Sequence, residues 1–355
     1  VHLSGASEAV AALQQDAHLP VMTTVMGKGV VDENHPLSIG VTGYAMGRLS
    51  PTRYMRPIIE QADVILMVGT RTNQNGTDSW ALYPENARYI HIDVDGAEIG
   101  RNYEALRLNG DAKLTLEAIY EKLKGRRDPA PGIEQSILGA RQKHAADIAA
   151  LEQSDNSPIR PERMAADIRQ VLSPDMMVVA DASYATLWVA CYLPALRDGM
   201  RFITPRGLAG LGWGLPLAIG AKVASPDSPV LCMVGDGGFA HVWSELETAA
   251  RRKTPIVLIV LNNSCLGYQK DAEDVKFGSH TTACYFTPVD HAAIARASGC
   301  RGVRIEKASD YLPALREALD RDETTVLDVI TDPEAYPPVT FFDGLDDIRK
   351  AREGD

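Results

Sequence analysis

The feature that most constrains this chain is the alternation of short apolar segments with longer amphipathic ones from end to end. Runs such as 230–234 and 256–261 have the length and β-branched composition of buried strands, and the stretches between them have the spacing of helices. Strands and helices that alternate in this way form parallel sheets with helices on both faces. The predicted fold class is therefore α/β, with doubly wound, Rossmann-like sheets.

The chain has 355 residues, which suits two domains of ~100–200 residues better than one core. We expect a central Rossmann-like domain over residues 1–125 and a second α/β domain over 156–355 that ends in a charged tail. Residues 126–155 combine a stretch rich in Gly, Pro and charge with a polar helical stretch. We interpret this segment as a linker and helix.

The same patterns predict individual elements in each domain. In the first domain we expect strands at 21–24, 64–69 and 89–93, and helices at 7–15, 50–61 and 114–123. In the second domain we expect strands at 176–180, 201–203, 230–234, 256–261, 302–304 and 325–330, and helices at 161–172, 213–224, 242–252, 288–297 and 310–319.

Charge and composition exclude several classes of protein. Acidic residues outnumber basic ones by 47 to 36 and no run is rich in Lys and Arg, which argues against a nucleic-acid partner. Every apolar stretch is far shorter than the ~20 residues that cross a bilayer, and the first residues show no signal-peptide pattern, so we expect no membrane partner and a cytoplasmic location. The five cysteines are widely spaced without a Cys-x-x-Cys pair, which favours reduced thiols.

The most informative segment is 230–263, where a strand, a helix and a second strand follow one another. The first strand ends in Gly-Asp-Gly-Gly at 235–238, and the second ends in Asn262 and Asn263. In a right-handed β-α-β unit the two strands are parallel neighbours, so Asp236 and Asn263 should emerge together at the carboxyl edge of the sheet. Ligands of open α/β sheets bind at that edge.

The side chains expected there favour a magnesium site. A carboxylate, an amide oxygen and a following main-chain carbonyl suit Mg²⁺, which completes its shell with phosphate oxygens and water. The glycines around Asp236 allow close approach of the backbone, and the N-terminus of the helix expected near Val242 favours a diphosphate. Gly-Asp-Gly alone is typical of a turn, but Asn263 lies 27 residues after Asp236 at the end of the next strand, which favours the ligand site.

These motifs resemble a known family. GDGGF, the following helix and LNN resemble the diphosphate-binding signature of thiamine-diphosphate enzymes, and the surrounding sequence is similar to the acetolactate synthase and benzoylformate decarboxylase group. The likeness extends over nearly the whole chain, through SGAS at 4–7, MGKG at 26–29, HPLSIG at 35–40, VGTR at 68–71, HIDVDGAEIG at 91–100 and GLAGLGWGLPLAIGAK at 207–222. It implies a central domain followed by a diphosphate-binding domain.

The resemblance also implies roles for single residues. Asp236 and Asn263, with the main-chain oxygen of Cys265, would bind Mg²⁺. Leu211 would be the apolar wedge that bends thiamine diphosphate, and the carbonyl of Ala209 would accept a hydrogen bond from its aminopyrimidine. The other expected cofactor contacts come from main-chain groups and side chains of Gly235, Gly237, Gly238, Gly210, Asn262 and Leu266, and from backbone or hydroxyl groups of Ser183, Tyr184 and Thr186.

Several of these roles have alternatives. Leu211 also fits a core position at the start of an apolar helix, and the loop at 181–186 also fits a structural role only. Tyr268 and Gln269 are expected to face substrate, with packing or surface positions as the alternative. Acetolactate synthases carry a Gln-Trp-Gln stretch after the paired asparagines, and this chain has LGYQKD at 266–271 instead, so the resemblance leaves the substrate open.

The catalytic glutamate of this family lies on a pyrimidine-binding domain that normally precedes the segment similar to 4–7. We expect that domain on another chain or in a missing upstream segment, and a homo- or hetero-oligomer, a dimer or tetramer, that completes the site. The central domain of the synthases binds FAD, but the stretch after Arg71 lacks the second arginine of an FAD holder. Nucleotide binding through Arg71, Asp93 and Asp95, or an empty spacer domain, both remain open.

The resemblance implies C–C bond cleavage or formation on small 2-oxo acids or 2-hydroxy ketones, as in an acetolactate synthase-like carboligase, a transferase or lyase. A 2-oxo acid decarboxylase of the benzoylformate type is the alternative within the family. Outside it, the alternatives are an FAD- or NAD-binding oxidoreductase and a non-catalytic subunit of the same fold. A dinucleotide site would require a Gly-x-Gly-x-x-Gly turn after the first strand, which residues 26–29 do not supply.

Overall fold

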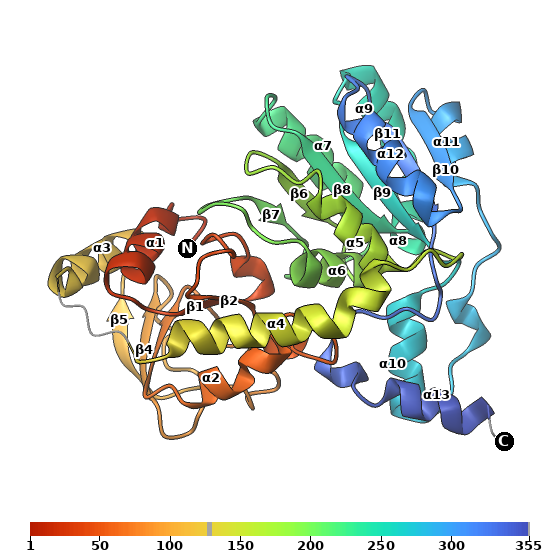
Figure 1. The fold of residues 1–355 in the computed structure, drawn as a ribbon. Helices are drawn as coiled ribbons and strands as arrows, with labels where there is room; N and C mark the ends of the chain where they lie inside the picture. Colours follow the sequence, from red (N-terminus) through yellow and green to blue (C-terminus); the bar gives the residue numbers. More distant parts are fainter. Residues whose placement is uncertain (126–129, 354–355) are drawn as a thin grey trace. The chain divides into compact units, whose positions relative to one another are not determined.

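A computed structural model of the chain describes residues 1–125 and 130–353 and divides into two units. The first unit is Val1–Asp147 with Pro194–Met200, and the second is Ile148–Leu193 with Arg201–Asp355 (Figure 1). All strand pairs in both units are parallel, which confirms the α/β class. The domain boundaries expected from the sequence stay a prediction, because residues 126–129 lie outside the described part and α4 (Ile133–Glu152) begins in one unit and ends in the other.

The second unit is built on a six-stranded sheet with the order β10-β11-β9-β8-β6-β7. Its strands are β6 (Met177–Ala180), β7 (Phe202–Ile203), β8 (Val230–Gly235), β9 (Val257–Asn262), β10 (Arg301–Ile305) and β11 (Thr325–Ile330). The longest apolar runs of the sequence form β8 and β9, which are buried along their length because helices cover both faces. They are the central pair of the sheet, so their ends are neighbours.

The helices of the second unit follow its strands in the order expected for a doubly wound sheet. They are α5 (Pro161–Arg169), α6 (Tyr184–Tyr192), α7 (Gly214–Ala224), α8 (Asp236–Ala240), α9 (Glu245–Arg252), α10 (Gly267–Phe277), α11 (His291–Ala297), α12 (Ala308–Leu319) and α13 (Leu345–Glu353). Sequence patterns predicted α5, α7, α9, α11 and α12 but not α6, α8, α10 or the bounds of α13. The helix expected at 242–252 is α9, which begins at Glu245, and the separate short helix α8 begins directly at the end of β8.

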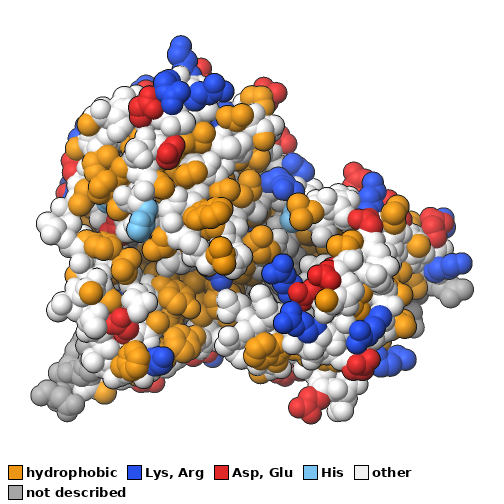
Figure 2. All heavy atoms as spheres, turned by 180° about the vertical axis from the view of Figure 1, so that it is seen from behind, with side chains coloured by type: hydrophobic (Ala, Val, Ile, Leu, Met, Phe, Trp, Pro, Cys, Tyr) orange, Lys and Arg blue, Asp and Glu red, His pale blue; other side chains and the backbone are white. Residues whose placement is uncertain are grey.

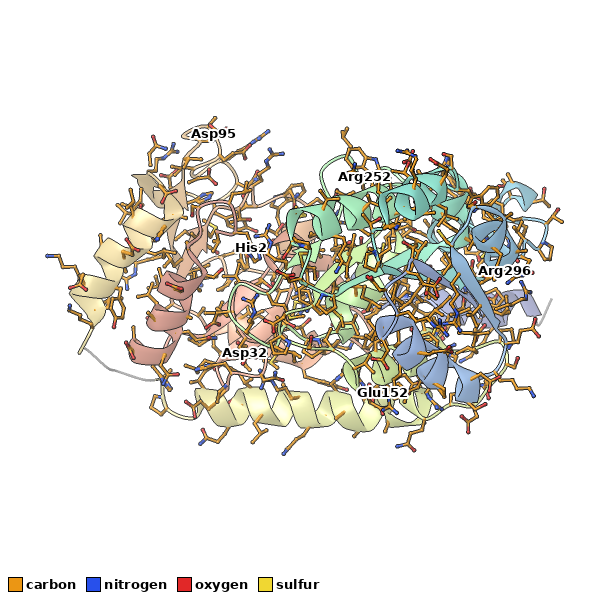
Figure 3. The ribbon with its side chains drawn as sticks, turned by 90° about the horizontal axis from the view of Figure 1, so that it is seen from above. His2, Asp32, Asp95, Glu152, Arg252 and Arg296 are labelled. Atoms are coloured by element: carbon orange, nitrogen blue, oxygen red, sulfur yellow. The ribbon has the colours of Figure 1, made fainter. Side chains whose placement is uncertain are left out.

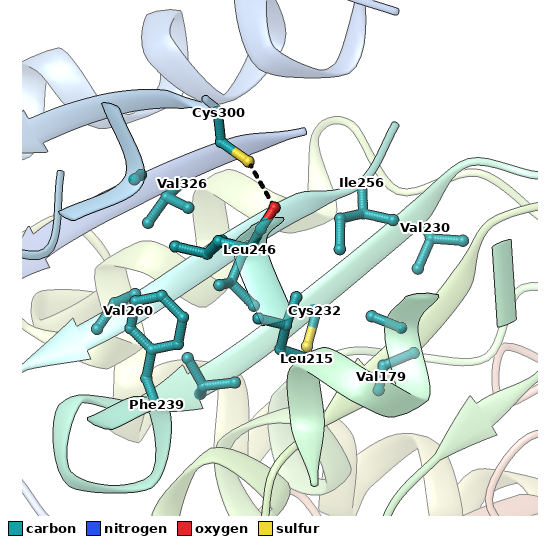
Figure 4. Close-up of a cluster of buried hydrophobic side chains, with 14 of the residues drawn as sticks. Val179, Leu215, Val230, Cys232, Phe239, Leu246, Ile256, Val260, Cys300 and Val326 are labelled. Atoms are coloured by element: carbon teal, nitrogen blue, oxygen red, sulfur yellow. Dashed lines mark hydrogen bonds between the residues drawn. The ribbon is translucent and has the colours of Figure 1, made fainter. Parts of the chain in front are cut away.

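One face of this sheet packs against α7, α9 and α11 through a single apolar cluster (Figure 4). Leu215 and Leu246 come from the helices and meet Val179, Cys232 and Val260 of the strands, all of them buried. The thiol of Cys300 donates a hydrogen bond to the carbonyl of Leu246, with Sγ to O 3.4 Å. This packing holds the strand ends rigidly, which a ligand site at the sheet edge requires.

The first unit contains a three-stranded sheet, β3-β4-β5, and a separate pair, β1-β2. Its elements are α1 (Ser7–Asp16), β1 (Val21–Thr23), β2 (Ser38–Val41), α2 (Arg56–Glu60), β3 (Val64–Val68), β4 (Arg88–Asp93), β5 (Ala105–Asn109) and α3 (Ala112–Leu123). The strands β2 and β5 were not predicted. The helix expected over 50–61 is wrong in length: a 3₁₀ turn at Arg53–Met55 precedes the short α2, because Pro57 has no amide to continue a longer helix and fits only a first turn.

Two further features of the described residues bear on partners. Among them, every helix falls short of the length and apolar character that a membrane span requires. On the face drawn in Figure 2, acidic and basic side chains are interspersed. Such a face lacks the one-sided positive field that attracts a phosphate backbone.

Candidate diphosphate and metal site

The ends of β8 and β9 lie side by side at the carboxyl edge of the six-stranded sheet. Gly235 pairs in register with Leu261. The Oδ2 atom of Asp236 accepts a hydrogen bond from the amide of Ser264 at 2.7 Å, and Oδ1 accepts one from the amide of Gly237 at 2.8 Å. The neighbouring strand ends predicted from the sequence are therefore confirmed, and the acidic side chain at one tip is bonded to the backbone at the other.

The charge of Asp236 is poorly stabilised by the protein itself. Burial is the main cause that raises the pKa of this carboxyl to about 7, with a smaller contribution from the charge of Asp328, despite the lowering effect of the Gly237 and Ser264 amides. Asp236 is 4% exposed, so little water reaches it. A divalent cation beside this carboxylate would favour its ionised form, so the site fits a metal on electrostatic grounds.

The other oxygens expected to bind the metal lie on the loop that follows β9. The Oδ1 atom of Asn263 accepts a hydrogen bond from the amide of Cys265 at 3.2 Å, and Ser264 between them has a φ of +55°. Cys265 also forms an isolated antiparallel bridge with Tyr285. The two hydrogen bonds of this bridge join Leu266 to Cys284 and Phe286 to Ser264, the residues on either side of the pair. The carbonyl of Cys265 therefore points away from Tyr285, and a ligand could approach it from the other side.

No group of three or more His, Cys, Asp or Glu side chains within the described residues could hold a metal ion. A cation at the strand ends would therefore need the carboxylate of Asp236, neutral oxygens from Asn263 and Cys265, and phosphate oxygens from a ligand. That mixed oxygen set is typical of Mg²⁺ bound with a diphosphate, and it is unlike the sites that Zn²⁺ prefers.

The glycines at the start of α8 let neighbouring side chains approach the backbone closely. A Cβ on Gly238 would lie 2.2 Å from Oδ2 of Asp181, and one on Gly237 would lie 2.9 Å from the ring of Phe286 and 3.0 Å from Leu266. Any larger residue at either position would force its neighbours to move. The helix that starts at Asp236 is therefore α8. The helix expected to start near Val242 is α9, which starts at Glu245, farther along the chain.

Sequence reasoning missed Asp181, which follows β6 and holds the neighbouring loop. Its carboxylate accepts hydrogen bonds from the amides of Gly212 at 2.9 Å and Trp213 at 3.0 Å, and from its own neighbour Ala182 at 2.9 Å. Like Asp236, Asp181 is an acidic residue directly after a buried strand. That sequence pattern could have revealed Asp181. Asp181 therefore fixes the loop at 209–213 against the edge of the sheet.

Three residues of that loop, Ala209, Gly210 and Leu211, were expected to support the cofactor. Ala209 has a φ of +55°, a conformation that costs about 1 kcal/mol for a residue other than glycine and is kept only where its surroundings impose it. Leu211 is 38% exposed, so it is not a core residue at the start of α7. Gly210, between them, has the indole nitrogen of Trp213 2.9 Å from the position of a Cβ. The roles of Ala209, Gly210 and Leu211 toward a cofactor stay predictions.

The loop after β6 has its hydroxyl groups largely engaged by protein. The hydroxyl of Tyr184 donates to Asp271, and that of Thr186 donates to the main-chain oxygen of Asp181. Ser183 is half-buried and has a φ of +67°. A contact of this loop with a diphosphate would therefore come from Ser183 or from main-chain groups.

The remaining expected residues are placed as follows. The side-chain nitrogen Nδ2 of Asn262 donates a hydrogen bond to Oδ1 of Asp328 at 2.8 Å, which fixes the end of β9. Gln269 is exposed and donates to Glu273 at 2.7 Å, and the ring of Tyr268 packs 5.4 Å from that of Phe342. The expected contacts of Tyr268 and Gln269 with substrate, and of Asn262 with a cofactor, stay predictions.

In the first unit, the residues considered for nucleotide binding serve a turn. Oδ1 of Asp93 accepts from the amide of Asp95 at 3.0 Å, and Oδ1 of Asp95 accepts from the amide of Ala97 at 2.9 Å. Figure 3 shows Asp95 at the outer end of this unit. Arg71 is exposed and lies 4.0 Å from Glu98. These contacts are those of a capped turn, and nucleotide binding through Arg71, Asp93 and Asp95 stays a prediction.

Comparison with known proteins matches two family models to separate parts of the chain. The family model for the thiamine pyrophosphate enzyme central domain matches residues 1–119, and the model for the C-terminal TPP-binding domain of the same enzymes matches residues 181–329. The chain belongs to the thiamine pyrophosphate enzyme family. The second match begins at Asp181 and includes both strand ends of the site described above.

Curated relatives of this family member include acetolactate synthases. A probable acetolactate synthase large subunit of Methanococcus aeolicus is 32% identical over 94% of this chain and 57% of its own length. A putative thiamine pyrophosphate-containing protein of Bacillus subtilis, YdaP, is 30% identical over 91% of this chain and 54% of its own length. The large subunit of acetolactate synthase isozyme 3 of Escherichia coli is 28% identical over 93% and 58%. The chain thus spans somewhat more than half the length of these relatives.

Proposed function

We propose that this chain binds the diphosphate of thiamine diphosphate through Mg²⁺, in an acetolactate synthase-like enzyme that cleaves or forms C–C bonds of 2-oxo acids or 2-hydroxy ketones. The observation that carries the proposal is the hydrogen bond from the Ser264 amide to Asp236, which brings a buried carboxylate at one strand end against the asparagine loop of the next. Family membership and the named relatives support it.

In this proposal each group has a distinct task. Asp236, the Asn263 amide oxygen and the Cys265 carbonyl would hold Mg²⁺, and the amides near Gly237 and Gly238 would face the diphosphate. When bound, thiamine diphosphate supplies a carbon nucleophile and an electron sink for the bond that is made or broken. The protein's part is therefore to bind and orient, and to exclude water from the reacting carbon.

The loop at 209–213 would orient the ring end of the cofactor. Asp181 fixes this loop through the amides of Gly212 and Trp213, and Leu211 at its centre offers a partly exposed apolar side chain. The carbonyl of Ala209 would accept a hydrogen bond from the aminopyrimidine. Positioning of this kind lowers the barrier by holding reacting groups in one geometry.

A complete site would also need a carboxylate against the pyrimidine ring. We propose that a pyrimidine-binding domain, on another chain or on another part of a longer chain, supplies it across an interface. We also propose a homo- or hetero-oligomer, in which the diphosphate half of the site on one chain meets the pyrimidine half on another.

A thermal-unfolding experiment on the full-length protein tests the proposal. We expect the melting temperature to rise with thiamine diphosphate and MgCl₂ together, to rise less with either alone, and to fall back to the value with thiamine diphosphate alone when EDTA is added. NAD and FAD serve as matched controls. Absence of a shift with thiamine diphosphate and Mg²⁺, or a shift only with NAD or FAD, would overturn the proposal.

An assay with several 2-oxo acids then defines the reaction. Measurement of CO₂ release together with chromatography of the organic product separates carboligation from simple decarboxylation. An acetolactate synthase-like enzyme should form a product with more carbon atoms than the aldehyde that remains when the 2-oxo acid loses CO₂. Release of the aldehyde alone would instead support a decarboxylase.

A further inference from the structure

Tyr184 packs against the loop at 263–267, which carries the proposed metal ligands Asn263 and Cys265. It is the first residue of α6 and is buried, and its hydroxyl donates a hydrogen bond to the carboxylate of Asp271 on α10. Burial, followed by the charge of Asp271, raises the pKa of Tyr184 well above its usual range, so the hydroxyl stays protonated and remains a donor. The hydrogen bond therefore links the loop after β6 to the helix that follows the metal loop.

Asp271 is in turn held from the C-terminal helix. Its side chain is fully buried, and Oδ1 accepts a hydrogen bond from Nη2 of Arg349 on α13 at 2.6 Å, while Oδ2 accepts from Tyr184. Nζ of Lys270 lies 3.6 Å from the same carboxylate, and Arg349 and Lys270 both also pair with Glu334. The positive charges of Lys270 and Arg349 balance the negative charges of Asp271 and Glu334. Both oxygens of the Asp271 carboxylate therefore have partners, and its position is well defined.

The ring of Tyr184 meets the metal loop at Gly267. A Cβ at Gly267 would lie 2.8 Å from Cε2 of Tyr184 and 3.4 Å from Nδ2 of Asn263. The ring, the first residue of α10 and the amide group of an expected metal ligand thus converge at one point. Because interiors are packed without spare volume, the position of the ring limits where the loop at 263–267 can lie.

We propose that Tyr184 is a positioning residue for the metal loop at 263–267, and that Asp271 and Arg349 hold it in place. The inference rests on the proposed function, because it names the groups that set the geometry of the Asn263 and Cys265 oxygens. Tyr184 does not touch the metal in this arrangement; it acts through the loop. The sequence resemblance pointed to Tyr184 as a diphosphate contact, whereas the contacts of its hydroxyl and ring assign it to support.

The first test compares Tyr184→Phe with the wild-type full-length protein and its pyrimidine-binding partner. The substitution keeps the ring and removes only the hydrogen bond to Asp271. We expect about tenfold more Mg²⁺ to be needed for half-maximal binding of thiamine diphosphate, in line with the typical worth of a hydrogen bond to a charged group. Tyr192→Phe, at the other end of α6, removes another buried hydroxyl and should leave this Mg²⁺ requirement unchanged.

A second readout separates positioning from general loss of stability. Mg²⁺ demands near-ideal octahedral geometry, whereas Ca²⁺ tolerates irregular sites. A loop that has lost its support should therefore weaken binding with Mg²⁺ more than binding with Ca²⁺, so the Mg²⁺-to-Ca²⁺ preference should fall several-fold in Tyr184→Phe. An unchanged preference would contradict a positioning role even if the protein were less stable.

Arg349→Gln keeps the test decisive if Tyr184→Phe does not fold. It removes the charged partner of Asp271 from a helix near the end of the chain, and it should shift the Mg²⁺ requirement and the metal preference in the same direction. Because both residues act through Asp271, the double variant should lose less than the sum of the single losses. Additive losses would overturn the proposal.

The outcomes also distinguish this inference from the proposed function. If the wild-type protein and its partner bind no thiamine diphosphate at any Mg²⁺ concentration, the proposed function fails and this inference fails with it. If the wild type binds the cofactor but Tyr184→Phe and Arg349→Gln require no more Mg²⁺ than Tyr192→Phe, the positioning role is overturned while the function stands.

Discussion

The carboxylate of Asp236 and the amide of Ser264 are 28 residues apart in the sequence and 2.7 Å apart in the fold. Removal of this carboxylate should abolish Mg²⁺-dependent binding of thiamine diphosphate, because Asp236 is the one charged oxygen ligand in the proposed set. Titration calorimetry of Asp236→Ala with thiamine diphosphate and MgCl₂ tests this. Asp310→Ala, on the exposed first turn of α12, is the control and should bind as the wild type does.

Affinity for Mg²⁺ should depend on pH through the same carboxyl. Its pKa is raised from 3.8 to about 7 by burial, so below pH 7 a proton must leave before the metal can bind. The apparent Mg²⁺ affinity should fall by about tenfold for each pH unit below 7 and level off above it. Measurement of the affinity of free thiamine diphosphate for Mg²⁺ at each pH corrects for the cofactor's own protons. A profile that stays flat between pH 5.5 and 7 after this correction would contradict the assignment.

Alanine substitutions at the two glycines of α8 should differ in their cost. A Cβ on Gly238 would lie 2.2 Å from the fixed carboxylate of Asp181, whereas one on Gly237 meets the outer atoms of two side chains that can shift. We expect Gly238→Ala to lower the free energy of unfolding by about 1–3 kcal/mol, and Gly237→Ala to lower it less. Urea unfolding measures both. Gly220→Ala, in α7 with open space around it, should be neutral or slightly stabilising.

The sequence allowed the centre of the second unit to be predicted because its signals are local. The apolar runs of β8 and β9 and the glycine and asparagine sequences that end them fix a β-α-β unit, and its right-handed crossover places both ends at one edge. The position of Asp236 beside the loop of Asn263 follows from these rules alone.

Other elements could not be predicted because their signals are not periodic. α6 is buried almost all round and so shows no alternation of apolar and polar positions, and Ser183, the residue before its first turn, has a positive φ that the sequence does not indicate. α10 buries the charged side chains Lys270, Asp271 and Asp274, which a search for an apolar face overlooks. The burial of Asp271 becomes understandable once Arg349, far along the chain, is seen to pair with it, and Lys270 and Asp274 likewise have partners in Glu334 and His280.

Asp181 is the residue whose importance depends most on distant contacts, and it offers the sharpest remaining test. Its carboxylate accepts from three amides at 2.9–3.0 Å, two of which belong to the loop at 209–213. Asp181→Asn turns one acceptor into a donor that faces an amide, so at least one bond is lost and replaced by repulsion. We expect the free energy of unfolding to fall by about 1.5–3 kcal/mol and the affinity for thiamine diphosphate to fall with it, because the loop loses its anchor.

Asp175→Asn, in the exposed turn before β6, makes the same chemical change without these contacts and serves as the control. Urea unfolding and cofactor titration of the two variants should therefore diverge, with only Asp181→Asn impaired in both. If Asp181→Asn unfolds more readily but binds the cofactor as tightly as the wild type, the loop at 209–213 is structural and Leu211 does not support the cofactor. Coupled losses of stability and affinity would instead tie the loop to the cofactor, because a single anchor then serves both.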